Sequence, residues 1–210
     1  MGTENATLMR DAQESLSGKW SLAIITLLVY GIIMSVSPCS YKIYYSFSLE
    51  LIPLIIGGPF ALGLSIFTLA ISRNQDARFS QLFYGFYLIW KAIGANLAII
   101  LFTILWTLLL VIPGIIAAIS YSLTFYIIAD DYSIGALDAI DKSKKMMYGY
   151  KWKYFRLSLR LLGLALLCIF TLGIGFFWLV PYSCVVMAKF YEDVNAIYME
   201  NEKQDIKYAR

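Results

Sequence analysis

The fold is decided by residues 130–193, which read DDYSIGALDAIDKSKKMMYGYKWKYFRLSLRLLGLALLCIFTLGIGFFWLVPYSCVVMAKFYED. Over 133–148, apolar residues recur at helical spacing and charged residues fill the other face, which predicts an amphipathic helix on a membrane surface. Two apolar stretches follow, 155–172 and 176–191, each close to the length that crosses about 30 Å of hydrocarbon. A glycine-rich turn at 173–175 joins them, so the stretch predicts a membrane hairpin with an amphipathic helix leading into it.

The composition assigns the whole chain to the membrane class. Of its 210 residues, 60% are hydrophobic and 15% are charged, and the mean hydropathy is +0.70, all outside the averages of globular proteins in water. The formal net charge of +3 is modest. Since the basic residues lie beside apolar stretches, membrane lipids with anionic headgroups are the expected partner and nucleic acid is not.

The same order of elements occurs twice more towards the N-terminus. Amphipathic stretches at 5–17 and 79–90 each precede two apolar stretches, and Gly18-Lys19-Trp20 and Trp90-Lys91 mark the joints between them. Glycine and tryptophan mark the joint of the last unit as well, from Gly149 to Lys153. The paired apolar stretches are 20–36 with 51–72, 92–112 with 115–129, and 155–172 with 176–191.

The sequence therefore predicts an all-α fold. We expect a polytopic membrane bundle of six transmembrane helices in three hairpins, each preceded by a cytoplasmic amphipathic helix. The hairpin units cover about 5–72, 77–129 and 133–191. They form a single membrane domain over 1–191, and the charged stretch 192–210 is a cytoplasmic tail with too few apolar residues to pack as a domain.

The distribution of lysine and arginine orients this bundle. With six spans, Lys42 is the only one of 17 lysines and arginines that lies in an outward segment. Because cytoplasmic segments carry the excess of basic residues in membrane proteins, the N-terminus and the C-terminus are both expected in the cytoplasm.

Glycine and proline interrupt the predicted spans at three places. The interrupting residues are Gly57, Gly58 and Pro59, then Pro113 and Gly114, and finally Pro181 after the glycines at 173–175. Interrupted helices at matching places are a sign of a transporter site, so a cavity at Gly57 and Gly58 would indicate a carrier or channel component. Tight turns also need glycine and proline, and this alternative explains the second and third places equally well.

Basic residues gather around the joint of the last unit and suggest a contact surface for lipid or a membrane protein partner. These residues are Lys142, Lys144, Lys145, Lys151, Trp152 and Lys153. Near an anionic membrane each lysine contributes about 1 kcal/mol of attraction. The alternative is that they serve only to set the topology.

No stretch carries the residues of a catalytic, cofactor or metal site. The chain has no histidine, and the three cysteines show no metal-ligand spacing. Asp130 and Asp131 would be the acids of a lipid-headgroup enzyme, but adjacent residues on a helix point about 100° apart and cannot act as a facing pair. We therefore expect a non-enzymatic membrane module, with the carrier or channel as the alternative and the enzyme the least favoured.

Several motifs in the second half of the chain are distinctive. They are Ile112-Pro113-Gly114-Ile115, the segment 136–155 with Met146-Met147, Leu172-Gly173-Ile174-Gly175, Trp178 to Tyr182 and Phe190-Tyr191. Together they resemble a bacterial family of multi-pass membrane proteins, the domain of unknown function 975. The resemblance implies an integral protein of the bacterial cytoplasmic membrane, distantly similar to the membrane domain of glycerophosphodiester phosphodiesterases. It implies no catalytic residue. Asp131-Tyr132 and Arg160 depart from the family's pattern, which cautions against assigning Asp130 or Arg160 a role from the family.

Overall fold

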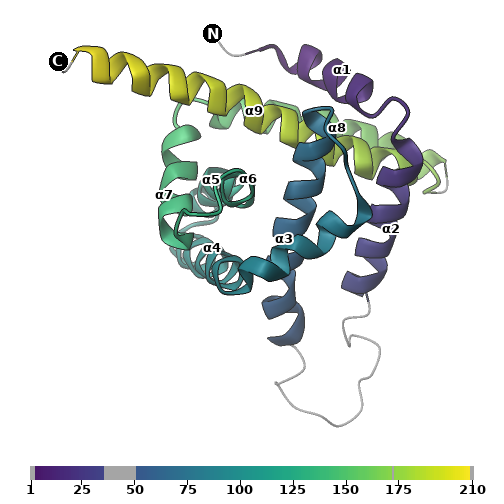
Figure 1. Cartoon of the computed structure of the whole chain (residues 1–210), viewed down its shortest axis with the longest axis horizontal. Helices are drawn as coiled ribbons and strands as arrows, with labels where there is room; N and C mark the ends of the chain where they lie inside the picture. The colour runs from purple at the N-terminus through teal and green to yellow at the C-terminus, as the bar shows by residue number, and fades with distance from the viewer. Residues whose placement is uncertain (1–2, 36–50, 172, 209–210) are drawn as a thin grey trace.

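The computed structural model describes residues 3–35, 51–171 and 173–208, and every element in that part of the chain is a helix (Figure 1). The all-α prediction is confirmed. In chain order the elements are α1 Asn5–Ser15, α2 Trp20–Ser35, α3 Leu51–Ser72, the 3-10 helix η1 Phe79–Leu88, α4 Ile89–Leu109, α5 Val111–Tyr121, α6 Thr124–Asp130, α7 Ala136–Met146, α8 Lys151–Phe170 and α9 Phe176–Tyr208.

Two of the three predicted amphipathic helices are present as separate elements. Helix α1 corresponds to 5–17 and α7 to 133–148, and the joints that follow them contain Gly18 with φ of 78° and Gly149 with φ of 84°. Glycine adopts this left-handed conformation without steric cost, so it lets the chain turn sharply between two helices. At the first joint, α1 and α2 differ in direction by 98°.

The third amphipathic stretch, 79–90, differs from the prediction. Residues Phe79–Leu88 form a 3-10 helix that passes straight into α4 with no joint between them. Its path is set by close contact with α3, since a Cβ added at Gly63 would lie 1.9 Å from the Leu82 carbonyl oxygen. A Cβ added at Gly85 would lie equally close, 1.9 Å, to the Pro59 oxygen.

A third glycine extends this contact to α4. A Cβ at Gly58 would lie 2.4 Å from the Ala92 carbonyl oxygen, a distance that no side chain tolerates. Only glycine lets the backbones of the three helices approach so closely. We call Gly58, Gly63 and Gly85 the glycine joint.

The helices do not share one direction. Figure 1 shows α9 running the length of the molecule across one end of α2 and α3, with α1 beside α9. Helix α3 is central, since it packs against η1, α4, α6 and α9. The main core lies among these helices and includes Phe67, Ile127 and Phe190, all buried.

The six predicted spans are not confirmed. Within the described residues, Phe79–Leu109 and Ile112–Asp130 are long and apolar enough to cross a membrane, and the bent pair Asn5–Ser15 with Trp20–Ile33 is a third if it counts as one span. Helix α8 has the length of a span, but four of its first ten residues are basic: Lys151, Lys153, Arg156 and Arg160.

The predicted interruptions do not break the helices. Helix α3 is continuous through Gly57, Gly58 and Pro59, and α9 is continuous through Pro181. A membrane helix tolerates proline when neighbours and local adjustments satisfy the freed backbone group.

The second predicted turn is displaced by three residues. The chain turns at Leu110, whose backbone is extended, and Pro113 and Gly114 lie in the first turns of α5. Proline fits a first helical turn because the N–H groups there have no helical partner. Helices α4 and α5 are neighbours, as the tight turn predicts.

The predicted tail at 192–210 is the largest difference from the sequence analysis. Helix α9 continues from Phe176 to Tyr208 without a boundary at residue 191. Tyr191 and Val194 are buried in the main core, so the first turns of the expected tail belong to the packed domain.

Candidate functional site

The charged residues of α3, α6 and α9 meet at one end of the core. Arg73, just after α3, forms ion pairs with Asp130 at 2.7 Å and with Glu192 at 3.1 Å. Tyr191 donates a hydrogen bond to Asp130 at 3.1 Å, and Ser72 donates one to Glu192 at 2.7 Å. These contacts join residues at least 57 positions apart in the sequence, so they fix how the helix ends meet.

A second ion pair lies one residue further along α9. Lys153 of α8 pairs with Asp193 at 2.6 Å, and their side chains are only 13% and 11% exposed. Thr3 donates to Asp193 through its backbone N–H at 2.9 Å and through its hydroxyl, and the Asn5 amide donates to the Lys153 carbonyl at 3.1 Å. We call these two groups of contacts, around Arg73 and around Asp193, the ionic joint.

The ionic joint keeps Asp193 charged. Burial of the carboxyl opposes ionisation, but the hydrogen bonds from Lys153 and Thr3 outweigh it, so the pKa of Asp193 lies below its usual range. The joint therefore holds the start of α1 and the start of α8 against the same turn of α9.

A polar pocket of about 370 Å³ opens beside this joint. It is lined by Thr3, Glu4, Asn5 and Ala6 at the start of α1 and by Lys153, Arg156 and Arg160 of α8. Arg156 and Arg160 are exposed, and no carboxylate among the described residues forms an ion pair with either. We call this the basic pocket, because its two unpaired guanidinium groups face an anion-sized space.

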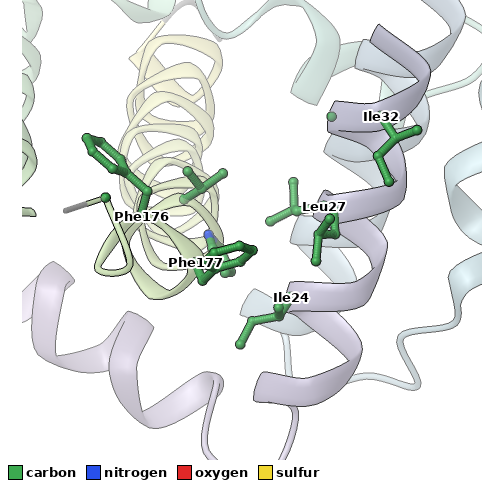
Figure 2. Close-up of a pocket in the computed structure, with 10 residues that line it drawn as sticks. Ile24, Leu27, Ile32, Phe176 and Phe177 are labelled. Carbon is green, nitrogen blue, oxygen red and sulfur yellow. The ribbon is translucent and has the colours of Figure 1, made fainter. Parts of the chain in front are cut away.

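A larger pocket, of about 470 Å³, is apolar and lies between α2 and α9. Figure 2 shows Leu27 and Ile24 of α2 facing Phe177 of α9 across it. Its lining is hydrocarbon and aromatic, so it offers no chemistry beyond apolar contact.

The comparisons with known proteins point to one family. Residues 91–197 match the family described as "Protein of unknown function (DUF975)". The chain belongs to this family. No curated protein and no solved structure matches it. The resemblance to the family is thereby confirmed, and the distant similarity to the membrane domain of glycerophosphodiester phosphodiesterases stays a prediction.

The part matched to the DUF975 family contains most of the charged site. It runs from the first turn of α4 into α9 and includes Asp130, Lys153, Arg156, Arg160 and Asp193. The start of α1, which closes the basic pocket, and Arg73 lie outside the matched part.

The structure separates the six predicted contact residues. Lys144 and Trp152 are exposed, Trp152 by 66%, and Lys144 and Lys151 line one small pocket where α4, α5, α7 and α8 meet. Lys145 pairs with Asp141 at 2.9 Å in an exposed i, i+4 pair on α7. Lys142 is half-buried. Lys153 is not available as a surface contact, because its ammonium group is buried against Asp193.

The residues proposed for other functions have structural roles. Asp130 is held by Arg73 and Tyr191, whereas Asp131 accepts hydrogen bonds from the backbone and hydroxyl of Ser133 at 2.9 and 2.6 Å. These bonds lower the pKa of Asp131, so it is a turn acceptor and a poor general acid. Helix α3 is continuous through Gly58, which packs against α4, and the carrier or channel alternative stays a prediction.

Sequence reasoning missed Arg73, Glu192 and Asp193. Arg73 and Glu192 are 119 positions apart, and no spacing rule connects them. One signal was available for α9: Phe190, Val194 and Tyr198 continue its apolar face at i, i+4 spacing past residue 191.

Proposed function

We propose that this chain is an integral membrane protein, without enzymatic chemistry of its own, that binds anionic lipid at the cytoplasmic boundary of a bacterial cytoplasmic membrane. The proposal keeps both termini in the cytoplasm and the three hairpins as membrane-inserted units. A membrane protein partner at the same surface is the competing occupant, and the lipid test below separates the two.

The observation that carries this proposal is the pair of exposed apolar hairpin ends. Around the α4–α5 turn and the α8–α9 turn, large apolar side chains lie on the surface, with Leu108 83% and Phe170 86% exposed. The exposed residues are Leu101, Ile104, Leu105, Leu108, Leu109, Leu110 and Ile112 in the first hairpin and Leu162, Leu166, Leu167, Ile169, Phe170, Ile174 and Trp178 in the second. Proteins in water rarely expose large apolar patches, and such patches mark contact with a membrane or with another protein. The hydrophobic composition of the chain favours the membrane.

The charges lie towards the opposite end of the second hairpin. Arg156 and Arg160 are on the first half of α8, and Asp193 and Glu192 are on the part of α9 beside it. A hairpin with an apolar end and a basic base matches insertion from the cytoplasmic side, with the base among the lipid headgroups.

Membrane insertion is tested by extraction and by labelling of single cysteines. In a background without Cys39, Cys168 and Cys184, we expect Ile174→Cys to react with an impermeant maleimide from outside the cell. Lys144→Cys should react only after the membrane is permeabilised. Release of the protein by alkaline carbonate, or labelling of Ile174→Cys and Lys144→Cys from the same side, would contradict the proposed topology.

Lipid binding is tested by the lipids that co-purify with the detergent-extracted chain. Reversal of the two pocket-lining lysines, Lys144→Glu with Lys151→Glu, should lower the fraction of anionic phospholipid retained. Lys203→Glu is the matched control, because Lys203 is an exposed lysine far along α9. Unchanged lipid with loss of a co-purifying protein would assign the surface to a protein partner instead.

A further inference from the structure

A single face of α8 carries two different surfaces in succession. Its basic half contributes Lys153, Arg156 and Arg160 to the basic pocket. Its apolar half contributes Leu164, Leu167, Cys168 and Thr171 to a second pocket of about 360 Å³. The positions 153, 156, 160, 164, 167 and 171 advance by three or four residues, which places them on one side of a helix.

Helix α1 forms the opposite wall of both pockets. Thr3 to Ala6 line the basic pocket and Gln13 lines the apolar one, together with Trp20 at the start of α2. Seven residues separate Ala6 from Gln13 and seven separate Arg160 from Leu167, about 10 Å of helix in each case. The two helices therefore run side by side in the same direction.

Helix α9 forms the floor between these walls. Thr3 and Lys153 both bond to Asp193 at one end, and at the other end Tyr182 donates to the Met9 carbonyl at 2.9 Å. Trp178, Leu179 and Tyr182 of α9 line the apolar pocket. Two pockets therefore follow one another between α1 and α8, the first basic at the start of both helices and the second apolar towards the α8–α9 turn, and we treat them as one α1–α8 groove.

We propose that this α1–α8 groove is a binding site for one anionic phospholipid molecule. The phosphate lies in the basic pocket between Arg156 and Arg160, and an acyl chain follows α8 past Leu164, Leu167 and Trp178. Guanidinium groups match phosphate oxygens in geometry and charge, and the N–H groups at the start of α1 add partial positive charge. This inference rests on the proposed membrane location and names the ligand class for a site separate from the α7 lysines.

The charges in the groove favour a lipid of net negative charge. Lys153 is neutralised by Asp193, so Arg156 and Arg160 supply the charge that attracts the ligand. Glu4 lies in the same pocket and opposes it. A zwitterionic headgroup would bring a second cation towards the two arginines, whereas phosphatidylglycerol brings only its phosphate and uncharged hydroxyls.

The groove contains its own reporter, Cys168. With Cys39→Ser and Cys184→Ser, the rate of maleimide labelling at Cys168 reports whether an acyl chain lies in the apolar half. The full chain in dodecyl maltoside would be titrated with phosphatidylglycerol or with phosphatidylcholine of the same acyl chains. We expect phosphatidylglycerol to slow labelling at a several-fold lower concentration than phosphatidylcholine.

Variants in the basic pocket and in the apolar pocket test the headgroup contact and the acyl-chain contact separately. Arg156→Gln or Arg160→Gln should weaken phosphatidylglycerol protection about tenfold, since each removes a charge-assisted hydrogen bond. Glu4→Gln should strengthen protection, and Arg10→Gln, an exposed arginine of α1 that does not line either pocket, should leave it unchanged. Leu167→Gln should weaken the protection of Cys168 by phosphatidylglycerol and by phosphatidylcholine to the same extent.

Three results would overturn the proposal. If phosphatidylglycerol and phosphatidylcholine protect Cys168 at the same concentration, the pocket does not recognise the headgroup. Full competition by glycerol phosphate makes the pocket a site for a free anion. Labelling of Cys168 that neither lipid slows places the lipid outside the groove. Each of these can occur in a protein that still inserts and orients as proposed, so the groove and the membrane topology fail independently.

Discussion

Two joints hold this protein together, and they work in opposite ways. The glycine joint connects α3 to η1 and α4 because Gly58, Gly63 and Gly85 have no side chains to keep the backbones apart. The ionic joint connects α9 to α3, α6 and α8 through charged side chains and to the start of α1 through the uncharged Thr3. The glycine joint depends on the absence of side chains, and the ionic joint depends on particular charged and polar groups.

The two joints therefore differ in how well they tolerate substitution. A close backbone contact has nothing that can move aside, so an added carbon at Gly63 meets a carbonyl at 1.9 Å. An ion pair can lose one bond and keep others, since Asp193 is bonded by both Lys153 and Thr3. We therefore expect a substitution at the glycine joint either to prevent folding or to have little effect. Substitutions at the ionic joint should lower the stability by amounts that depend on how many contacts they remove.

The largest effect is expected for Gly63→Val. Its branched side chain would overlap the Leu82 backbone, and neither helix can shift without moving the contact between Pro59 and Gly85. We expect no monodisperse protein by size-exclusion chromatography in detergent, whereas wild type elutes as one species.

Gly57→Ala is the matched control for this substitution. A Cβ there meets only the Asn96 amide, at 3.8 Å, which is ordinary contact. Because alanine favours a helix over glycine by up to about 1 kcal/mol, Gly57→Ala should raise the melting temperature slightly. If Gly63→Val folds as well as Gly57→Ala, close approach does not hold α3 and η1 together.

Loss of the buried pair in the ionic joint is expected to have the next largest effect. Lys153→Met leaves the Asp193 carboxylate buried with only Thr3 as a partner, which costs about 3 kcal/mol. The double variant Lys153→Met with Asp193→Leu should recover most of this loss, because it leaves no unpaired charge. A thermal-melting double-mutant cycle measures the difference, and additive effects would mean that the two side chains do not interact.

Acid should weaken the same pair by a smaller amount. The folded pKa of Asp193 is depressed, so its stabilisation is complete above the unfolded value of about 3.9 and is lost as the pH falls through the folded value. Melting temperatures of wild type and Asp193→Asn should therefore converge as the pH falls below about 4. A difference in melting temperature between wild type and Asp193→Asn that stays constant from pH 7 down to pH 3 would show that Asp193 contributes nothing through its charge.

The sequence predicted the helices better than the joints. Residue periodicity marks a helix within a few turns of itself, so α1, α7 and the apolar stretches of α3, α4 and α8 were all expected within a few residues of their observed bounds. The glycines of α3 are also visible in the sequence. They suggest an interruption because sequence alone does not show whether a glycine faces a cavity or a neighbouring backbone.

The ionic joint could not be predicted, for a different reason. Its pairs connect α1, α3, α6, α8 and α9 over distances in sequence that no local rule covers. The charges of Glu192 and Asp193 suggest a solvated tail, and only the packing of α9 makes the Asp193 side chain buried and the Glu192 side chain half-buried. For the basic pocket, Arg156 and Arg160 were visible as one face of α8, but the opposing wall formed by α1 was not.

The smallest graded effect in the ionic joint is expected at Arg73. Its side chain is 34% exposed and its partners Asp130 and Glu192 are 28% and 24% exposed, so water screens these pairs more than it screens Lys153 and Asp193. Arg73→Gln retains a hydrogen-bond donor and removes only the charge. We expect a loss of about 1 kcal/mol, measured by thermal melting in the same detergent.

Lys145→Gln provides the matched comparison for Arg73→Gln. Lys145 pairs with Asp141 at 2.9 Å, about as close as Arg73 to Asp130, but both side chains are more than half exposed and belong to one helix. Its removal should leave the melting temperature unchanged within error, since the pair holds no two elements together. If Lys145→Gln and Arg73→Gln destabilise equally, the link between helices adds nothing to the stability that the Arg73 pairs provide, and the ionic joint reduces to the contact between Lys153 and Asp193.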